Sequence, residues 1–478
     1  MVFEEKSFAR NVALLEQRLK VNENFDMLSR ELVIGGRRSR FYQIDGFCKD
    51  DMMQKMLQFF IGITDKQMPD SADSFLLLQM PHVEAQTTDA VEKAVQSCLS
   101  GEFLLVIDGY EQIIIIDART YPARTVTEPD KDKVMRGSND GFVETIVANT
   151  ALIRRRIRSE QLRMEMIQLG ETSQTDIVLC YMEGRVDQNL LQMIRHKIQT
   201  TMVDALTMNQ ESLAECLYPG KWFNPFPKFR YTERPDTATA QILEGNLIIL
   251  VDNSPQAMML PVSLLDLLEE ADDFYFPPVT GTYLKISRFL IALITYFLTP
   301  TFLLFMQNPQ WIPELFRFVM LKETSNLPLI WQFLILELAV DGLKLAAINT
   351  PGMLSTPLSV LAAIVLGELS VSSGWFNGEV MLYMAFVAVA NYTQASYELG
   401  YAIKFLRIIQ LVLTALFNVY GYVLGIIFTV CCLVFNKTIA GTSFTEPLIP
   451  FRPKKLFHRL IRKRIYFANK DGANTREG

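Results

Sequence analysis

Long apolar stretches in the last 190 residues constrain this chain more than any other feature. Phe289–Pro313 contains no charged residue and is long enough to cross, as a helix, a bilayer core of roughly 30 Å. The pattern recurs at Leu327–Ile348, Pro357–Phe376, Val380–Tyr397 and Ile408–Phe435. We therefore predict an α-helical transmembrane bundle over residues 286–435, followed by a basic tail, 436–478.

One of these stretches, Leu327–Ile348, carries three charged residues. Glu337, Asp341 and Lys344 stand at positions i, i+4 and i+7, which places them on one face of a helix. Charged groups inside a bilayer need protein or water around them. Two interpretations stay open: a structural pair between a carboxylate and Lys344, or the lining of an ion path. We expect 327–348 to be a re-entrant or partly buried helix.

A second candidate for an ion path is Glu368, the one charged residue of its stretch. Small side chains around it allow helices to approach closely or to surround a narrow lumen. We predict that Glu368 faces a lumen shared between subunits, lined also by Ala362, Ala363, Gly367 and Ser370.

Glycines and basic residues near the end of the chain bear on packing and on orientation. Gly421 and Gly425 stand four residues apart in the last apolar stretch, which predicts a helix-packing motif. The tail 436–478 holds 10 Lys and Arg against 3 Asp and Glu, so the positive-inside rule places it in the cytoplasm. The N-terminal sequence has no apolar region typical of a secretory signal. We expect both termini in the cytoplasm, and therefore about four full spans besides 327–348.

The first 288 residues differ in charge, with 31 basic against 42 acidic residues. This balance argues against nucleic-acid binding. Two sequence patterns each occur twice. A strand, an acidic residue followed by glycine, and a helix are expected at Phe41–Leu57 and Leu179–Ile194. A β-hairpin is expected at Gly101–Ala118 and again at Gly245–Val262.

The repeats predict an α/β N-terminal cytoplasmic domain of two related subdomains, 1–140 and 170–285. Apolar residues at helical spacing predict a linking helix over 141–169. That helix carries the basic cluster Arg154–Arg158. We interpret this cluster as a solvated face, with contact to anionic headgroups or to an acidic neighbouring subunit as the alternative.

Catalytic motifs are missing from the sequence. It has no P-loop, no glycine fingerprint after a strand, and no G-x-S-x-G motif. His82, His196 and His458 lie far apart, without Cys or His partners at the spacing of metal ligands. We therefore expect no enzyme activity, no cofactor and no metal.

Two sequence blocks resemble the A subunits of bacterial spore germinant receptors, the GerA type. EPDKDKVMRGSNDGFVETIVANTALIRRRIR (128–158) is similar to the most recurrent block of that family, and NPFPKFRYTERPD (224–236) is similar to its second block. Their order and spacing match, and so does the membrane region that follows. The resemblance covers nearly the whole chain.

The resemblance implies a role in germination and a place in the spore inner membrane. It implies a homo-oligomer, a pentamer in this family, that conducts ions. It also implies companion germination membrane proteins as partners. The apolar stretches add membrane lipid as a further partner. It implies no catalytic residues. Two alternatives stay open: a non-conducting scaffold for other germination proteins, or an accessory subunit for dipicolinic acid release.

Overall fold

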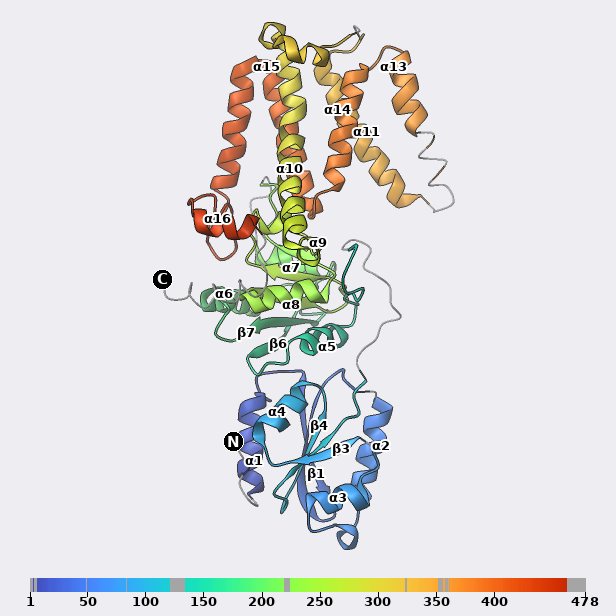
Figure 1. Ribbon diagram of the computed structural model, residues 1–478, viewed down its shortest axis with the longest axis vertical. Coiled ribbons are helices and arrows are strands. Elements are labelled where there is room, and N and C mark those ends of the chain that lie inside the picture. The colour runs from blue at the N-terminus through green and yellow to red at the C-terminus, as the bar shows by residue number, and fades with distance from the viewer. Residues whose placement is uncertain are drawn as a thin grey trace. The chain divides into compact units, whose positions relative to one another are not determined.

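A computed structural model describes residues 3, 7–48, 50–82, 84–120, 134–218, 224–322, 325–350, 356, 360 and 362–461. The chain forms two compact units (Figure 1). The first, here called the α/β unit, comprises Met1–Pro219 and Phe229–Pro261. The second, the helical unit, comprises Gly220–Lys228 and Val262–Gly478.

The α/β unit contains two five-stranded sheets built by corresponding elements. The first copy runs α1 (Phe8–Leu19), β1 (Met27–Ile34), β2 (Arg37–Ile44), α2 (Asp50–Ile61), α3 (Ala72–Gln79), β3 (Ala85–Thr88), α4 (Val91–Leu99), β4 (Phe103–Ile107), β5 (Ile113–Ile116). The second runs α5 (Ile146–Arg156), β6 (Leu162–Leu169), β7 (Thr175–Met182), α6 (Gln188–Thr200), α7 (Gln210–Leu217), β8 (Arg230–Thr232), α8 (Pro235–Glu244), β9 (Leu247–Val251), β10 (Ala257–Leu260).

The two sheets have matching strand orders, β1-β2-β4-β5-β3 and β6-β7-β9-β10-β8, and all their pairings are antiparallel. Both predicted hairpins are present, as β4–β5 and β9–β10. At the start of each hairpin a glycine has positive φ, 95° at Gly101 and 100° at Gly245. A side chain at Gly245 would meet the backbone oxygen of Arg185 at 2.7 Å, so the close approach requires glycine. The prediction of two related α/β subdomains is confirmed.

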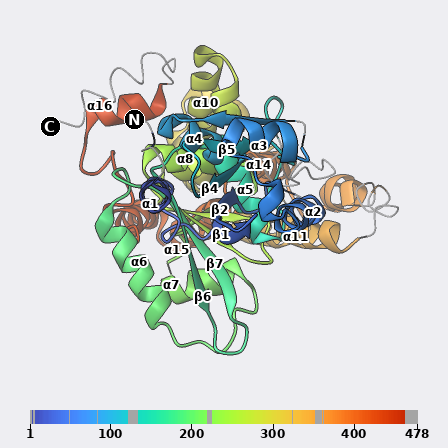
Figure 2. The ribbon, with the colours of Figure 1, turned by 90° about the horizontal axis from the view of Figure 1, so that it is seen from below.

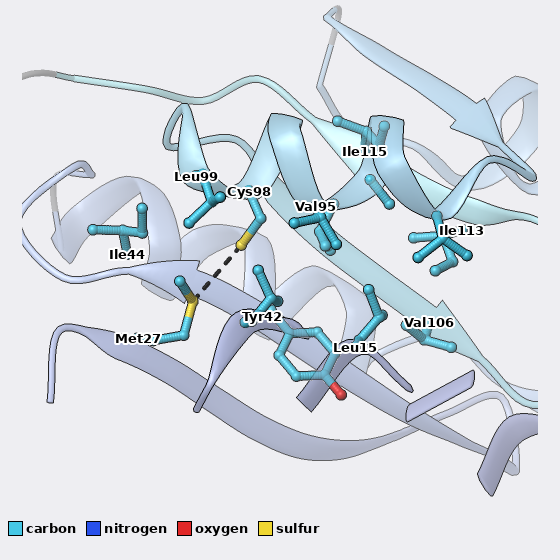
Figure 3. Close-up of a cluster of buried hydrophobic side chains, with 14 of the residues drawn as sticks. Leu15, Met27, Tyr42, Ile44, Val95, Cys98, Leu99, Val106, Ile113 and Ile115 are labelled. Atoms are coloured by element: carbon cyan, nitrogen blue, oxygen red, sulfur yellow. Dashed lines mark hydrogen bonds between the residues drawn. The ribbon is translucent and has the colours of Figure 1, made fainter. Parts of the chain in front are cut away.

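Alternation along β4 explains why the first sheet is buried on both faces. Leu104 and Val106 point into one apolar cluster, and Phe103, Leu105 and Ile107 point into the other. Helices α1 and α4 cover the first face with Leu15, Val95 and Cys98, as Figure 3 shows. Helices α2 and α3 cover the second face. In the second copy, α5 and α8 pack on one face and α6 lies beside β6 (Figure 2).

The segment predicted as a linking helix, 141–169, is only partly helical. Helix α5 ends at Arg156, and the strand β6 begins at Leu162. The solvated interpretation of the basic cluster is wrong for Arg154. Its guanidinium is buried and forms two hydrogen bonds to Asp26, at 2.8 and 2.9 Å. Spacing along the chain could not indicate this partner, because it lies 128 residues away.

The helical unit consists of α10 (Pro278–Gln307), α11 (Leu329–Asn349), a π-helical segment η5 (Ala363–Leu369) continued by α13 (Ser370–Ser372), α14 (Gly378–Tyr392), α15 (Tyr397–Val434) and α16 (Pro453–Leu460). Among the described residues, α10 and α15 are long and apolar enough to cross a membrane. The core of the helical unit consists of two clusters of buried apolar side chains. One surrounds Tyr296 and Leu406, and the other surrounds Phe302 and Phe333. With this helical region after the two sheets, the predicted fold class is confirmed.

Helix α15 departs from the prediction of a single span over Ile408–Phe435. It is broken at Asn418, where φ is 54° and ψ is −129°. Side-chain amides of Asn418 and Asn308 bond to each other at 2.6 and 3.3 Å beside the break. Two arms, 397–417 and 419–434, therefore fold back on each other as a helical hairpin (Figure 1). One polar residue within an apolar stretch gave no signal for the reversal.

Candidate functional site

Four charged residues meet between α11 and the first arm of α15. Glu337 and Asp341 come from α11, and Lys404 and Arg407 come from α15. The Arg407 guanidinium donates from Nε to Glu337 at 2.9 Å, and Lys404 Nζ lies 3.5 Å from the same carboxylate. Lys404 also forms an ion pair with Asp341. Spacings of four and three residues put each pair on one helical face. We call these four residues the charge cluster.

Three of the four residues in the charge cluster are almost completely withdrawn from solvent, and Asp341 is half-buried. Glu337, Lys404 and Arg407 are 4%, 4% and 2% exposed. Burial of an unpaired charge is costly, and each of these groups has an opposite charge and further polar contacts. Arg407 donates to the carbonyl of Thr295 on α10 at 3.1 Å, and Lys404 donates to the carbonyl of Glu337 at 3.1 Å. The cluster therefore fastens α10, α11 and α15 to one another.

Sequence reasoning missed Lys404 and Arg407 because they lie between two predicted apolar stretches, Val380–Tyr397 and Ile408–Phe435. The structure pairs both acidic residues of α11 with these two, whereas Lys344 lies over the ring of Tyr392, 4.8 Å from its centre. The signal was present in the sequence. Two basic residues three positions apart lead directly into the last apolar stretch, as the two acidic residues interrupt an earlier one.

A small pocket opens beside the charge cluster, between α11, α14 and α15. Its polar lining comes from Glu337, Asp341, Lys344, Asn391, Lys404 and Arg407. One carboxylate oxygen of Asp341, Oδ1, is buried without a hydrogen-bond partner among the described residues. The pocket can therefore hold water against a carboxylate. Within the described part of the chain, no group of three or more His, Cys, Asp or Glu side chains could hold a metal ion.

Glu368 lies in a different environment from the charge cluster. It is exposed on the π-helical segment η5, and no basic side chain of the described residues lies within 4.0 Å of it. The other predicted lining residues surround it in sequence: Ala363 is exposed, and Ala362, Gly367 and Ser370 are half-buried. Apolar neighbours Ile364 and Leu369 are 45% and 54% exposed. This face therefore presents one carboxylate among apolar side chains.

The glycines of the predicted packing motif lie where the two arms of α15 meet. A side chain at Gly421 would fall 1.8 Å from the carbonyl oxygen of Leu413 on the first arm. At Gly425 it would fall 2.9 Å from a side-chain carbon of Gln410. Both glycines thus face the other arm of the same hairpin.

The motif NPFPKF contributes its first five residues to the helical unit. The Asn224 amide donates to Asn436 at 3.1 Å, and the ring of Phe226 packs 5.6 Å from that of Phe444. Lys228 donates to Asn436 and to the carbonyl of Lys437, just after the second arm of α15. Burial lowers the pKa of Lys228 to about 8. This part of the motif therefore holds the segment after α15 in place, through contacts with Asn436, Lys437 and Phe444.

Comparison with known proteins places these features in a family. The family model described as "Bacillus/Clostridium GerA spore germination protein" matches residues 14–472. Stage V sporulation protein AF of Bacillus subtilis (strain 168) is 34% identical over 455 residues, 95% of this chain and 92% of that protein. Spore germination protein A1 of the same organism is 24% identical, covering 94% of this chain and 90% of that protein.

One solved structure is similar to part of this chain. The N-terminal domain of the A subunit of the Bacillus megaterium spore germinant receptor GerK3 aligns with 54% of this chain and 96% of its own length, with 21% identity and a TM-score of 0.41. The family match spans both units and agrees with the resemblance found in the two sequence blocks. This chain belongs to the GerA family of spore germination proteins.

Proposed function

We propose that this chain forms an oligomeric, ion-conducting channel of the spore inner membrane, with Glu368 lining the path. The observation that carries this proposal is the exposure of Glu368 among apolar neighbours in an apolar helical segment. A carboxylate facing lipid is costly, whereas a ring of carboxylates around water is tolerated and attracts cations. Association of several copies around η5 would provide that ring.

Helix packing, rather than conduction, is the role that we assign to the charge cluster. Its two carboxylates face two basic side chains at ion-pair distance. An ion that entered the cluster would have to displace an internal partner. Glu337 and Asp341 are the competing candidates for the path, but Glu368 is favoured because, among the described residues, no basic side chain lies within 4.0 Å of it.

Membership of the GerA family supports a proposal about partner proteins. Relatives include Spore germination protein KA of Bacillus subtilis (strain 168), 24% identical over 468 residues. We propose that this chain works with companion germination membrane proteins and assembles as a homo-oligomer, with five copies as the first arrangement to test. Ala362, Ala363, Gly367 and Ser370 would line the lumen beside Glu368.

Ion flux from proteoliposomes that contain the full-length protein tests the proposal. Glu368→Gln keeps the side-chain shape and removes the charge, so cation flux or cation selectivity should fall while the oligomer still assembles. Asp341→Asn is the matched comparison, because it removes one carboxylate of the competing candidates on α11. Unchanged selectivity in Glu368→Gln, with loss in Asp341→Asn and Glu337→Gln, would move the path to α11.

Absence of flux from the unmodified protein, alone and in complete assemblies with its companions, would contradict the channel. A non-conducting scaffold would then be favoured if companion proteins fail to assemble without this chain. Loss of dipicolinic acid release in the same deletion, with companions still assembled, would favour an accessory role in that release.

A further inference from the structure

The helix after the hairpin, α16, and the turn that leads into it carry exposed apolar and basic side chains. Ile449, Phe451 and Phe457 are 45%, 68% and 56% exposed. Lys454 is exposed, and the side chain of Lys455 is 63% exposed. We call these five residues the outer face. Residues 447–461 contain four basic residues and no acidic residue.

The opposite side of α16 is fastened to the helical unit. Leu456 packs against the cluster that contains Tyr296 and Leu406. Arg459 forms an ion pair with Asp266, and its carbonyl accepts a hydrogen bond from Lys285 Nζ at 2.6 Å. Residues three and four positions apart share a face of a helix, so Leu456, Arg459 and Leu460 point inward together. Lys454, Lys455 and Phe457 are therefore exposed on a fixed helix, and Ile449 and Phe451 lie in the turn that leads into it.

The anchor also sets the level of α16 along α10. Lys285 stands four residues, about one turn, before Phe289, where the charge-free stretch of α10 begins. If α10 crosses a bilayer, Lys285 lies at the headgroup level, where Lys and aromatic side chains are enriched. The hydrogen bond from Lys285 to the carbonyl of Arg459 holds α16 at that same level.

We propose that the outer face of α16 binds the anionic headgroup layer of the membrane that α10 crosses. Phenylalanine rings would enter the boundary between headgroups and acyl chains, and the lysines would contact lipid phosphates. Glu446 already takes part of the basic charge, through Arg452 at 2.7 Å and Lys455 at 3.4 Å. Lys454 lies outside that pair and is the first lysine to test.

Anionic lipid fits this surface better than an acidic protein does. A protein partner could pair with the lysines, but the level of α16 places its aromatic rings where a lipid interface already lies. Each lysine near an anionic surface contributes about fivefold to binding. A second copy of this chain is unsuited to the same surface, because two basic faces would repel each other.

The experiment uses the full-length protein in vesicles, with one fluorescent label. Phe451→Cys carries the label in a background where Cys48, Cys216, Cys431 and Cys432 are serine, and the fully buried Cys98 and Cys180 stay. Quenching by spin-labelled phosphatidylglycerol is compared with quenching by spin-labelled phosphatidylcholine at equal amounts. We expect stronger quenching by phosphatidylglycerol, and a loss of this preference in high salt or in Lys454→Glu/Lys455→Glu.

Two label positions serve as controls. Leu416→Cys, on the first arm of α15, reports insertion, because residue 416 is 69% exposed in an apolar stretch. Phe318→Cys, 72% exposed in the connection between α10 and α11, should show no lipid preference. Quenching at 416 with none at 451, or with equal quenching by both lipids at 451, would overturn the proposal while leaving the channel proposal intact.

Discussion

Glu337 is the residue on which the charge cluster depends most. Its carboxylate faces both Arg407 and Lys404, and its side chain is 5% exposed. Among the described basic residues, Lys404 is the one at ion-pair distance from Asp341, whose side chain is 29% exposed. Loss of Glu337 would leave two basic groups to share one partly solvated carboxylate. Glu337 should therefore contribute more than Asp341 to the stability of the helical unit.

We expect Glu337→Leu to destabilise the helical unit by about 3–5 kcal/mol, because it leaves Arg407 buried without its carboxylate. The double change Glu337→Leu/Arg407→Leu should recover much of this loss, since Asp341 still neutralises Lys404. Thermal unfolding of the detergent-solubilised protein measures both. Arg317→Ala is the control, because Arg317 and Glu314 are 67% and 86% exposed and should contribute little. A double variant less stable than the single would refute the cluster as described.

Lys228 gives the stability of the helical unit a pH dependence of unusual sign. Its folded pKa of about 8 lies below the ordinary value of 10.5, so the folded state binds this proton less tightly than the unfolded state does. Stability contributed by the group should therefore rise as the pH increases from about 8 to about 10.5. Chemical unfolding across that range should show the rise in the unmodified protein. Lys228→Met should lack it; an identical pH profile in that variant would contradict the assignment.

At the scale of elements, the hairpin of α15 was only partly predictable. Apolar content and length indicated helix over Ile408–Phe435, and α15 is helical on both sides of Asn418. The break depends on contacts that sequence spacing does not reveal, namely the amide pair with Asn308 and the approach of Gly421 to Leu413. The glycines were recognised as a packing motif, but their partner is the preceding arm of the same helix.

Substitution of the hairpin glycines should separate the two contacts. Gly421→Ala places a carbon against the backbone of Leu413 and should cost about 1–3 kcal/mol, because backbone cannot move aside. Gly425→Ala meets Gln410 less closely, at 2.9 Å from Cγ and 3.2 Å from the backbone Cα, and should cost less. Gly342→Ala on α11 is the control, because no atom lies within 4 Å and alanine favours helix. If unfolding measurements show a larger loss of stability in Gly425→Ala than in Gly421→Ala, this geometry is wrong.

At the scale of the whole molecule, the duplicated α/β unit was the most predictable part. Turn glycines and strand length recur in both copies, and local signals of that kind specify hairpins. The contact that joins the copies was not predictable. Asp26 precedes β1 and Arg154 lies on α5, and both side chains are 1% exposed. Burial of this pair depends on tertiary packing, which a basic run in a sequence does not encode.

We expect Asp26→Asn to destabilise the α/β unit by about 3–5 kcal/mol, because Arg154 then stays buried opposite a neutral amide. Differential scanning calorimetry of the full-length protein would follow the transition of this unit. Asp187→Asn is the control, since asparagine caps the start of α6 nearly as well as aspartate. Equal transition temperatures in Asp26→Asn and Asp187→Asn would show that the Asp26–Arg154 pair does not hold the two copies together.

The number of helical passes decides on which side of the membrane the two ends lie. We predict that α10, α11, the segment of η5 and α13, α14 and each arm of α15 all cross the membrane, which gives an even number of passes and replaces the re-entrant course expected for 327–348. We predict that the α/β unit and the chain after α15 face the same compartment, the cytoplasm of the spore, in agreement with the basic tail. Single cysteines at Ser7 and Thr442 should be labelled by a membrane-impermeant reagent from one side of oriented vesicles. A cysteine at Glu314, in the connection after α10, should react from the opposite side. Labelling of positions 7 and 442 from different sides would leave one arm of α15 outside the bilayer and contradict the even count.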